Sequence, residues 1–350
     1  MRPAVRDLTR GSASLRIDWD VRTPYDFVFS LSGDAGSTDD LPAKDREWLA
    51  TSRKALEPEV QAGITDLFES ELAIHAGVLL VEKPDVRTSA DFVELVAATP
   101  PRDLIGALFT DDYHGVDVSD LIARAIDGDE TAIPSLADRL PEWNKKGRLE
   151  ILRDPSTAKK RIQRVLTAWQ GRFAEIEPRV LAILERDYDS RAADRERLAP
   201  SDLIETTTGG LRYLPEAGIS RVILGPSYFS RPYNFLMSSR EWRFFGYPVA
   251  DSALDPSDEL TPPLSVVRLH RALGDETRLR ILKLLASRDL YLTEIAQELD
   301  LSKPTIKHHL AQLRAAGLVT ITESGTVMYY SLRRNRLDDA SAEIKKFLVG

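Results

Sequence analysis

Cysteine is absent from this 350-residue sequence, and histidine and methionine are scarce, with five and three copies. Without cysteine, the chain forms no disulfide and offers no thiolate ligand to a metal. Long apolar runs are also missing: GVLLV, at 77–81, is the longest undiluted one, whereas a membrane-spanning helix needs roughly 20 residues. The opening residues, MRPAVRDLTR, lack the apolar core of a signal peptide. We therefore expect a cytoplasmic protein with no membrane partner.

The motifs of common enzyme classes are missing as well. The sequence contains no nucleotide-binding glycine loop, no nucleophile elbow and no metalloprotease helix. The acidic and histidine residues between Asp111 and His114 fit a solvated loop, and His75, inside the apolar run AIHAGVLL, fits a core histidine. We therefore predict that the chain is not an enzyme and needs no cofactor.

The composition is that of a soluble globular protein, with 43% hydrophobic and 29% charged residues. The length allows two domains, each with its own core. The net charge of −8 is unevenly distributed. Residues 265–350 hold 14 Lys and Arg against 10 Asp and Glu, a net of +4, so the remainder holds 33 against 45, a net of −12. A basic C-terminal part is what contact with DNA phosphates requires.

The first 250 residues are predicted to be mainly helical, with breaks at prolines and glycines. A long helix from about Ser156 to Arg197 carries apolar residues at alternating steps of four and three, which is the seam of a core helix or of a coiled coil. Pro178 is expected to bend this helix. Aromatic and β-branched runs at 208–250 predict a short β-meander. The acidic, proline-rich residues 251–264 predict a linker between domains.

The stretch from Thr293 to Gly317 has the pattern of two short helices joined by a tight turn. Thr293 is predicted to cap the first helix and Ser302 the second, while Gly317 ends the second. At 100° per residue, one face of the second helix is apolar, and the opposite face carries small, polar and cationic residues. Such a face can approach a DNA groove closely.

The neighbouring segments complete a known arrangement. LGDETRLRILKLLAS, at 273–287, reads as a helix capped by Asp275, and VTITES-G-TVMYYSL, at 319–332, reads as a β-hairpin. The order of helices and hairpin is that of a winged helix-turn-helix. Together with LTEIAQELDLSKPTIKHHLAQLRAAGLV, these segments resemble an ArsR-type winged helix-turn-helix transcriptional regulator over about a quarter of the chain. The helical N-terminal domain resembles those of some uncharacterised bacterial ArsR-like regulators.

The predicted fold class is mainly α with small β elements. A large helical N-terminal domain at 1–250, with its β-rich part at 208–250, precedes the linker and a winged helix-turn-helix domain at 265–350. Contacts with double-stranded DNA are predicted for polar and cationic residues of the second helix and of the hairpin's end: Ser302, Lys303, Thr305, Lys307, His308, Gln312, Arg314, Arg333 and Arg334.

The resemblance further implies a homodimer, because the first and last helices of such modules form the dimer interface. In this sequence the corresponding apolar residues are Val267, Leu269, Leu273, Leu337, Ile344 and Phe347. Many relatives sense metals through cysteines, or through His, Asp and Glu on the last helix. Here the first set is missing, and the last helix offers acids without histidine, so no metal site is predicted.

We therefore predict a repressor that binds an operator as a homodimer and whose N-terminal domain senses a non-metal small molecule or a protein partner. The expected wing tip, Thr322-Glu323-Ser324-Gly325-Thr326, carries a carboxylate where relatives commonly carry arginines, so strong minor-groove reading by the wing is not expected. Two alternatives stay open. The winged helix could serve protein–protein assembly, or the N-terminal domain could be an enzyme with a regulatory tail.

Overall fold

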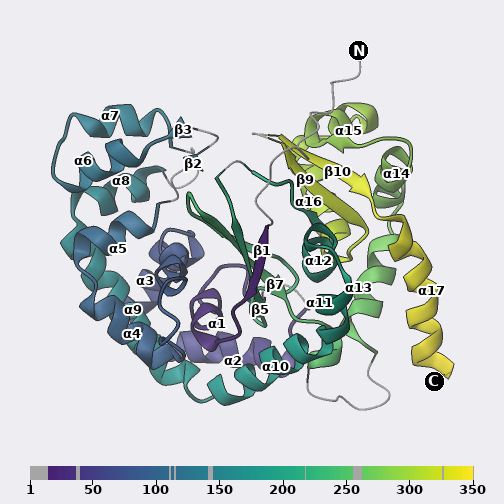
Figure 1. Ribbon diagram of the computed structural model, residues 1–350, viewed down its shortest axis with the longest axis horizontal. Helices are drawn as coiled ribbons and strands as arrows, with labels where there is room; N and C mark the ends of the chain where they lie inside the picture. The colour runs from purple at the N-terminus through teal and green to yellow at the C-terminus, as the bar shows by residue number, and fades with distance from the viewer. Residues whose placement is uncertain are drawn as a thin grey trace.

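A computed structural model describes residues 15–36, 40–109, 112–113, 116–140, 145–216, 218–254, 262–324 and 327–349. As predicted, the chain is mainly helical with small sheets (Figure 1). The N-terminal helices form an arc around a central sheet, and the C-terminal elements lie together on one side, with α17 outermost. Two hydrophobic clusters lie wholly within residues 15–254 and a third lies wholly within 262–349. We call these two ranges the N-terminal part and the C-terminal part.

The α-helices of the N-terminal part are α1 (Thr23–Phe29), α2 (Ala43–Lys54), α3 (Pro58–Gly63), α4 (Ser89–Ala98), α5 (Pro101–Ala107), α6 (Ser119–Ile126), α7 (Ala132–Ala137), α8 (Lys145–Arg153), α9 (Pro155–Phe173), α10 (Glu177–Ser190), α11 (Ala192–Arg197) and α12 (Pro200–Thr207). Helices of other types are η1 (Ile64–Glu69), η2 (Ile74–Leu80) and η3 (Asp251–Ala253). Its strands are β1 (Arg16–Trp19), β2 (Asp112–Tyr113), β3 (Val116–Asp117), β4 (Leu211–Arg212), β5 (Arg221–Ser227), β6 (Phe235–Ser238) and β7 (Trp242–Pro248).

The long predicted helix is present as three helices, α9, α10 and α11, with a break before Pro178 in the first turn of α10. Its apolar seam is core: Trp169 and Phe173 are fully buried against the rest of the N-terminal part. The buried indole of Trp169 donates to Ser30 Oγ at 2.8 Å, so its polar atom is satisfied. Of the two interpretations of the seam, a core helix or a coiled coil, the core helix is therefore correct.

The predicted β-meander at 208–250 is wrong in its topology. The sheet has the order β1-β5-β7-β6, in which β1, β5 and β7 are parallel and only β6 is antiparallel to its neighbour. A parallel pair needs a long crossover, and the segment between β5 and β6 carries the chain past the place of β7. Asp26 holds the start of that segment, because its buried carboxylate accepts from the backbone N–H groups of Tyr228 and Phe229.

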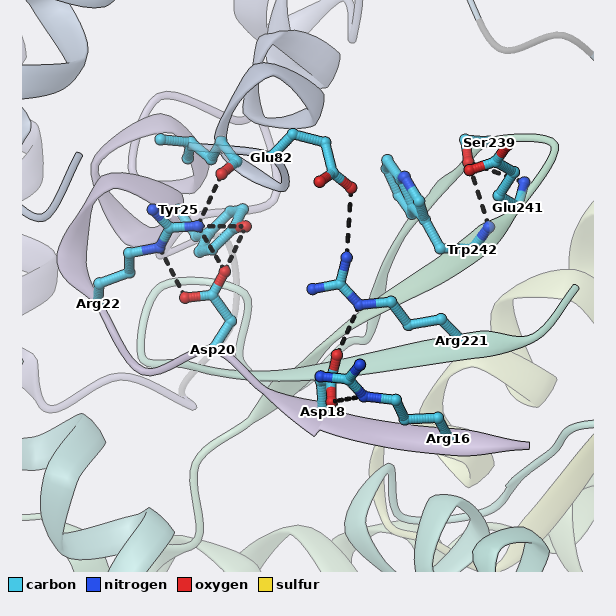
Figure 2. Close-up of polar contacts among 11 residues, drawn as sticks. Arg16, Asp18, Asp20, Arg22, Tyr25, Glu82, Arg221, Ser239, Glu241 and Trp242 are labelled. Carbon is cyan, nitrogen blue, oxygen red and sulfur yellow. Dashed lines mark hydrogen bonds and ion pairs between the residues drawn. The ribbon is translucent and has the colours of Figure 1, made fainter. Parts of the chain in front are cut away.

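Strand β1 is fixed in place by side-chain contacts across and beside the sheet (Figure 2). Arg221 Nε, on β5, donates to Asp18 Oδ2 at 2.6 Å. Beyond the strand, the buried guanidinium of Arg22 donates to the carbonyl oxygens of Leu80, at the end of η2, and of Lys83, and pairs with Asp20 at 2.6 Å. The Arg221–Asp18 bond joins β1 to a sheet strand about two hundred residues later, and the bonds of Arg22 hold the end of β1 against η2 and the residues after it.

The C-terminal part has the predicted winged helix-turn-helix order. It consists of α13 (Leu264–Leu273), α14 (Glu276–Leu285), β8 (Leu290–Tyr291), α15 (Leu292–Leu299), α16 (Lys303–Ala315), β9 (Val319–Ser324), β10 (Val327–Leu332) and α17 (Arg334–Val349). Asp275 caps α14 as predicted, by accepting from Arg278 N at 2.9 Å. The predicted cap Thr293 lies inside α15, which begins one residue earlier, with Tyr291 at the N-cap position.

The two parts are joined by a strand. Leu211 and Arg212 of β4 pair in parallel with Ile321 and Thr322 of the wing strand β9, giving a sheet of order β4-β9-β10-β8. This residue pair, expected within the N-terminal meander, thus belongs to the wing sheet. Residues 255–261, half of the predicted linker, lie outside the described residues; the described ends are η3 and the start of α13. None of the described helices is long and apolar enough to cross a membrane.

Candidate nucleic-acid interface

Helix α16 is the second helix of the helix-turn-helix, and local sequence explains both of its ends. Ser302 Oγ accepts from Thr305 N at 3.3 Å, which satisfies one of the free amides of the first turn. The preceding helix α15 ends at Asp300, which takes the left-handed conformation with φ 52°. Gly317, with φ 70°, ends α16 in the same conformation. The tight turn between the two helices therefore follows from residues that tolerate it.

The apolar face of α16 is buried as predicted, with Ile306, Leu310 and Leu313 in the core of the C-terminal part. Because three residues at this spacing fix the rotation of the helix, the opposite face must point outward. The structure brings five of the predicted DNA-contacting residues to this outward face, all exposed: Ser302, Lys303, Thr305, Lys307 and His308. Two hydroxyls, two ammonium groups and an imidazole can donate to phosphate oxygens or to base edges.

Gln312 is half-buried beside this face, and its side chain links those of Arg278 and His308 through hydrogen bonds. Arg278 Nη1 donates to Gln312 Oε1, and Gln312 Nε2 lies 2.7 Å from His308 Nε2. Because the amide nitrogen donates, His308 Nε2 is the acceptor, and its ring proton is assigned to Nδ1. Arg278 also donates to the carbonyl oxygens of Ala272 and Arg271. Arg278 thus orients His308, a role that no local sequence pattern signals.

The three remaining arginines of the prediction do not share the outward face of α16. Arg334 is exposed, but its guanidinium donates to the carbonyl oxygen of Ala286 at 2.6 Å, at the end of α14. Arg314 and Arg333 line a cavity between the two parts of the chain. Burial lowers the pKa of both guanidinium groups, so these side chains lie in a poorly solvated place.

Comparison with known proteins assigns this arrangement to a family. Residues 275–320 match the family described as "Bacterial regulatory protein, arsR family". The HTH-type transcriptional regulator KmtR of Mycobacterium tuberculosis is 36% identical over 88 residues, which cover 25% of this chain and 67% of KmtR. The transcriptional repressor SdpR of Bacillus subtilis is 39% identical over 70 residues, which cover 20% of this chain and 78% of SdpR. The chain belongs to the arsR family of bacterial regulatory proteins.

A further relative is the arsenic resistance transcriptional regulator of Pseudomonas putida, which is 40% identical over 21% of this chain and 55% of its own length. The name of that relative refers to arsenic. Within the described ranges of the present ArsR-family chain, no group of three or more His, Asp or Glu residues is arranged to hold a metal ion. Each of these matches leaves at least three quarters of this chain uncovered, so the N-terminal part has to be understood from its own structure.

The predicted dimer residues of this ArsR-family chain differ in their accessibility. Leu269 is fully buried in the C-terminal core, and Leu273 packs against that core. Val267 and Phe347 line the cavity between the two parts, and Ile344 is half-buried. Leu337, on α17, is 39% exposed. Helices α13 and α17 contact each other within the chain, so Leu269 stabilises the protomer, and α17 carries the accessible apolar surface.

Glu71 of the N-terminal part lies toward the outward face of α16. Glu71, which follows η1 with a positive φ of 61°, is exposed and lies within electrostatic reach of Lys307. Partial desolvation and the carboxylate of Asp34 raise the pKa of Glu71, whereas Arg148 and Lys307 oppose the rise. A carboxylate in this position lowers the positive electrostatic potential at Lys307. Two residues of the predicted wing tip, 325 and 326, lie outside the described residues.

Proposed function

We propose that this ArsR-family chain represses transcription by binding an operator as a homodimer through the outward face of α16. The observation that carries the proposal is the exposure of Ser302, Lys303, Thr305, Lys307 and His308 on one side of a helix whose other side is core. The formal net charge of +4 in residues 265–350 supports contact with phosphates. Lys303 and Lys307 would supply phosphate attraction, while Thr305 and His308 would reach base edges.

The proposed dimer forms through α13 and α17. Leu337 is 39% exposed, and Leu348 and Val349, at the end of α17, are 70% and 76% exposed. Burial of apolar surface of this kind in a second copy would be favourable. A two-fold dimer would place two α16 helices roughly 34 Å apart, in successive major grooves of a palindromic site. The repressor role is proposed by analogy with relatives such as SdpR, whose name describes a repressor.

The N-terminal part is proposed to sense a non-metal small molecule or a protein partner. Its strand β4 pairs with the wing strand β9, and Asp40 forms an ion pair with Arg268 on α13. A change in the N-terminal part would therefore be transmitted directly to the elements that surround α16. This direct connection favours a sensing role over that of an independent enzyme.

The proposal is tested by selecting fragments of the source organism's genomic DNA with the purified full chain, followed by footprinting of the enriched fragment. We expect a protected, roughly palindromic site about two helical turns long. The double variant Thr305→Ala with His308→Ala should lose discrimination between this site and a scrambled one. The control is Lys54→Ala, at an exposed position on α2, which should keep that discrimination. Sedimentation velocity with and without Leu337→Asp tests the dimer separately.

Equal retention of all genomic fragments, or protection that survives the double substitution, would contradict the assignment of α16. Specific capture of another protein with no enrichment of DNA would instead favour the alternative in which the winged helix serves assembly.

A further inference from the structure

A large cavity lies between the two parts of the chain, with a volume of about 1500 Å³. Its walls come from α12, α13, α16 and α17 and from the segments that follow α1 and flank β7. The described residues that line it include ten Lys and Arg but three Asp and Glu, a formal excess of 10 − 3 = 7 positive charges. The net charge of the whole chain is −8, so this excess of positive charge is local to the cavity. It favours the binding of an anion there.

Four arginines of the cavity lie in or beside the C-terminal turn of α16, and the guanidinium groups of three of them lie against its backbone. Arg268 Nη1 donates to the carbonyl oxygen of Ala315 at 3.3 Å, and Arg336 Nε donates to that of Ala316 at 3.4 Å. The side chains of Arg333 and Arg336 both lie beside Gly317. Arg314 belongs to the turn itself. The C-terminus of a helix attracts cations, but its partial charge of about −0.5 cannot balance four of them.

Nearby carboxylates pair with two of these four groups. Arg268 forms an ion pair with Asp40, and Arg336 forms a bidentate pair with Glu343 at 2.5 and 3.1 Å. Arg268 Nη2 nevertheless remains buried without an acceptor among the described residues.

Arg314 and Arg333 have no side-chain hydrogen bond and no ion pair with a described residue. The titratable groups close enough to act on Arg314 are the phenol groups of Tyr233 and Tyr330, which are neutral at pH 7 because the pKa of each is raised above its usual value. Arg333 instead lies within reach of the charges of Glu205, Arg336 and Asp339. Burial lowers the pKa of both guanidinium groups. A poorly solvated cation without a bound acceptor is costly, and an anion from solution would remove that cost.

We propose that this cavity binds a small organic anion whose carboxylate or phosphate groups lie at Arg314 and at Arg333. The planar guanidinium group matches both anionic groups with paired N–H donors. The apolar part of the ligand would lie against Ile183, Val267 and Phe347, which also line the cavity. The volume exceeds that of common small-molecule sites, which is about 300–1,000 Å³, so a metabolite-sized anion fits.

The site lies where a ligand can act on α16. Arg268 joins Asp40 of the N-terminal part to the last turn of α16, and Arg314 is a residue of that turn. An anion held at Arg314 would change the balance of charges that sets the position of this helix end. Its role as the effector of the regulator rests on the proposed function, whereas its binding does not. A coupling of this kind requires only that the ligand bind the DNA-competent and DNA-incompetent arrangements unequally.

The binding test is isothermal titration of the full chain with citrate and with inorganic pyrophosphate at constant ionic strength. We expect saturable binding of at least one of these probes to the wild type and to the control Lys54→Gln. Arg314→Gln and Arg333→Gln should each weaken it by at least about tenfold, the loss of one charge-assisted contact. Arg314→Lys keeps the positive charge but loses the paired N–H donors of the guanidinium group. Its affinity for the anion should therefore lie between those of the wild type and Arg314→Gln.

Removal of a half-buried, unpaired cation is expected to preserve or raise Tm, so a lowered Tm identifies a variant that fails to fold. In that case the comparison of the wild type with Arg314→Lys decides the test. Absence of saturable binding to the wild type, or equal affinity in the wild type, Arg314→Lys and every folded glutamine variant, would overturn the proposal.

DNA titrations of the same preparations separate this site from the proposed function. In Arg314→Gln, added anion should no longer change the affinity for the selected genomic fragment, whatever that affinity is without anion. DNA binding without anion binding overturns the cavity site and leaves the regulator proposal standing. Anion binding by a chain that selects no DNA supports the site and overturns the regulator.

Discussion

The replacement of Lys307 by alanine offers a quantitative test of how α16 meets DNA. Lys307 is exposed on the outward face of α16, and its side chain supports no core contact, so the substitution should change stability by less than about 0.5 kcal/mol. Each phosphate neutralised by a protein cation contributes about −0.9 to the slope of log K against log salt. A homodimer loses one contact in each protomer, and the slope should therefore become less negative by about 1.8.

The same relation gives the loss of affinity. At an ionic strength of about 0.15 M, one contact is worth roughly a factor of 5, so loss of two contacts weakens binding about 30-fold, or about 2 kcal/mol. A monomer bound to a single half-site would show only half the slope change, about 0.9. The slope therefore reports the number of α16 helices on the DNA as well as the role of Lys307.

Fluorescence anisotropy with the selected fragment, at several salt concentrations between about 50 and 300 mM, measures this slope directly. The control is Lys54→Ala, which removes the same charge from an exposed position on α2. An unchanged slope in Lys307→Ala would refute the placement of this ammonium group at a phosphate. An equal change of slope in both variants would show that the net charge of the protein, and not the position of Lys307, determines the salt dependence of DNA binding.

Three further changes test other parts of the structure. Glu71→Gln should raise DNA affinity by a few-fold, because a carboxylate that competes for Lys307 is removed; an unchanged anisotropy titration would contradict that competition. Burial raises the pKa of Asp26 to about 6, above its unfolded value of about 3.9, so its contribution to stability is complete below pH 4 and falls by about 3 kcal/mol as pH rises through 6. Urea denaturation should show this decline in the wild type and not in Asp26→Asn; parallel profiles would contradict it. Gly210→Val should lower Tm and expose the β4–β9 junction to proteolysis, because Gly210 has φ 121° and a Cβ there would lie 3.1 Å from the carbonyl oxygen of Val319; an unchanged digestion pattern would show that the junction tolerates the side chain.

The features that the sequence predicts well are those decided by neighbours along the chain. Ser302 and Asp275 cap their helices as predicted because a cap depends on three or four consecutive residues. The outward face of α16 follows from the spacing of Ile306, Leu310 and Leu313, which fixes the helix rotation. The winged helix-turn-helix is built almost wholly from such local signals, and the outward-facing residues of α16 could be named from them.

The features that escaped prediction depend on contacts between distant segments. The pairing of β1 with β5 joins residues about two hundred positions apart, and four-residue β1 carries no sign of its partner. For the same reason β4 could not be assigned to the wing sheet. Arg314 lies on α16 as predicted, but the N-terminal part encloses its flank of the helix, and only that tertiary arrangement turns it from solvent to cavity. The phase of the helix predicts the direction of the Arg314 side chain, but it does not show which distant segment of the chain lies in that direction.

The arrangement of charges around α16 implies that its two flanks have different roles. The N-terminal half of the helix presents unburied ammonium groups at Lys303 and Lys307, which suit contact with phosphates that arrive and leave. The C-terminal turn instead carries Arg314 and lies beside Arg333, whose guanidinium groups are poorly solvated. Such groups suit a ligand that is shielded from water. Because one rigid helix carries both ends, a shift of its C-terminal turn relative to the N-terminal part also moves Lys307 relative to Glu71. Occupancy of the cavity and competition at Lys307 are therefore expected to be linked, and the double variant Glu71→Gln with Arg314→Gln should bind DNA with an affinity that added anion no longer changes.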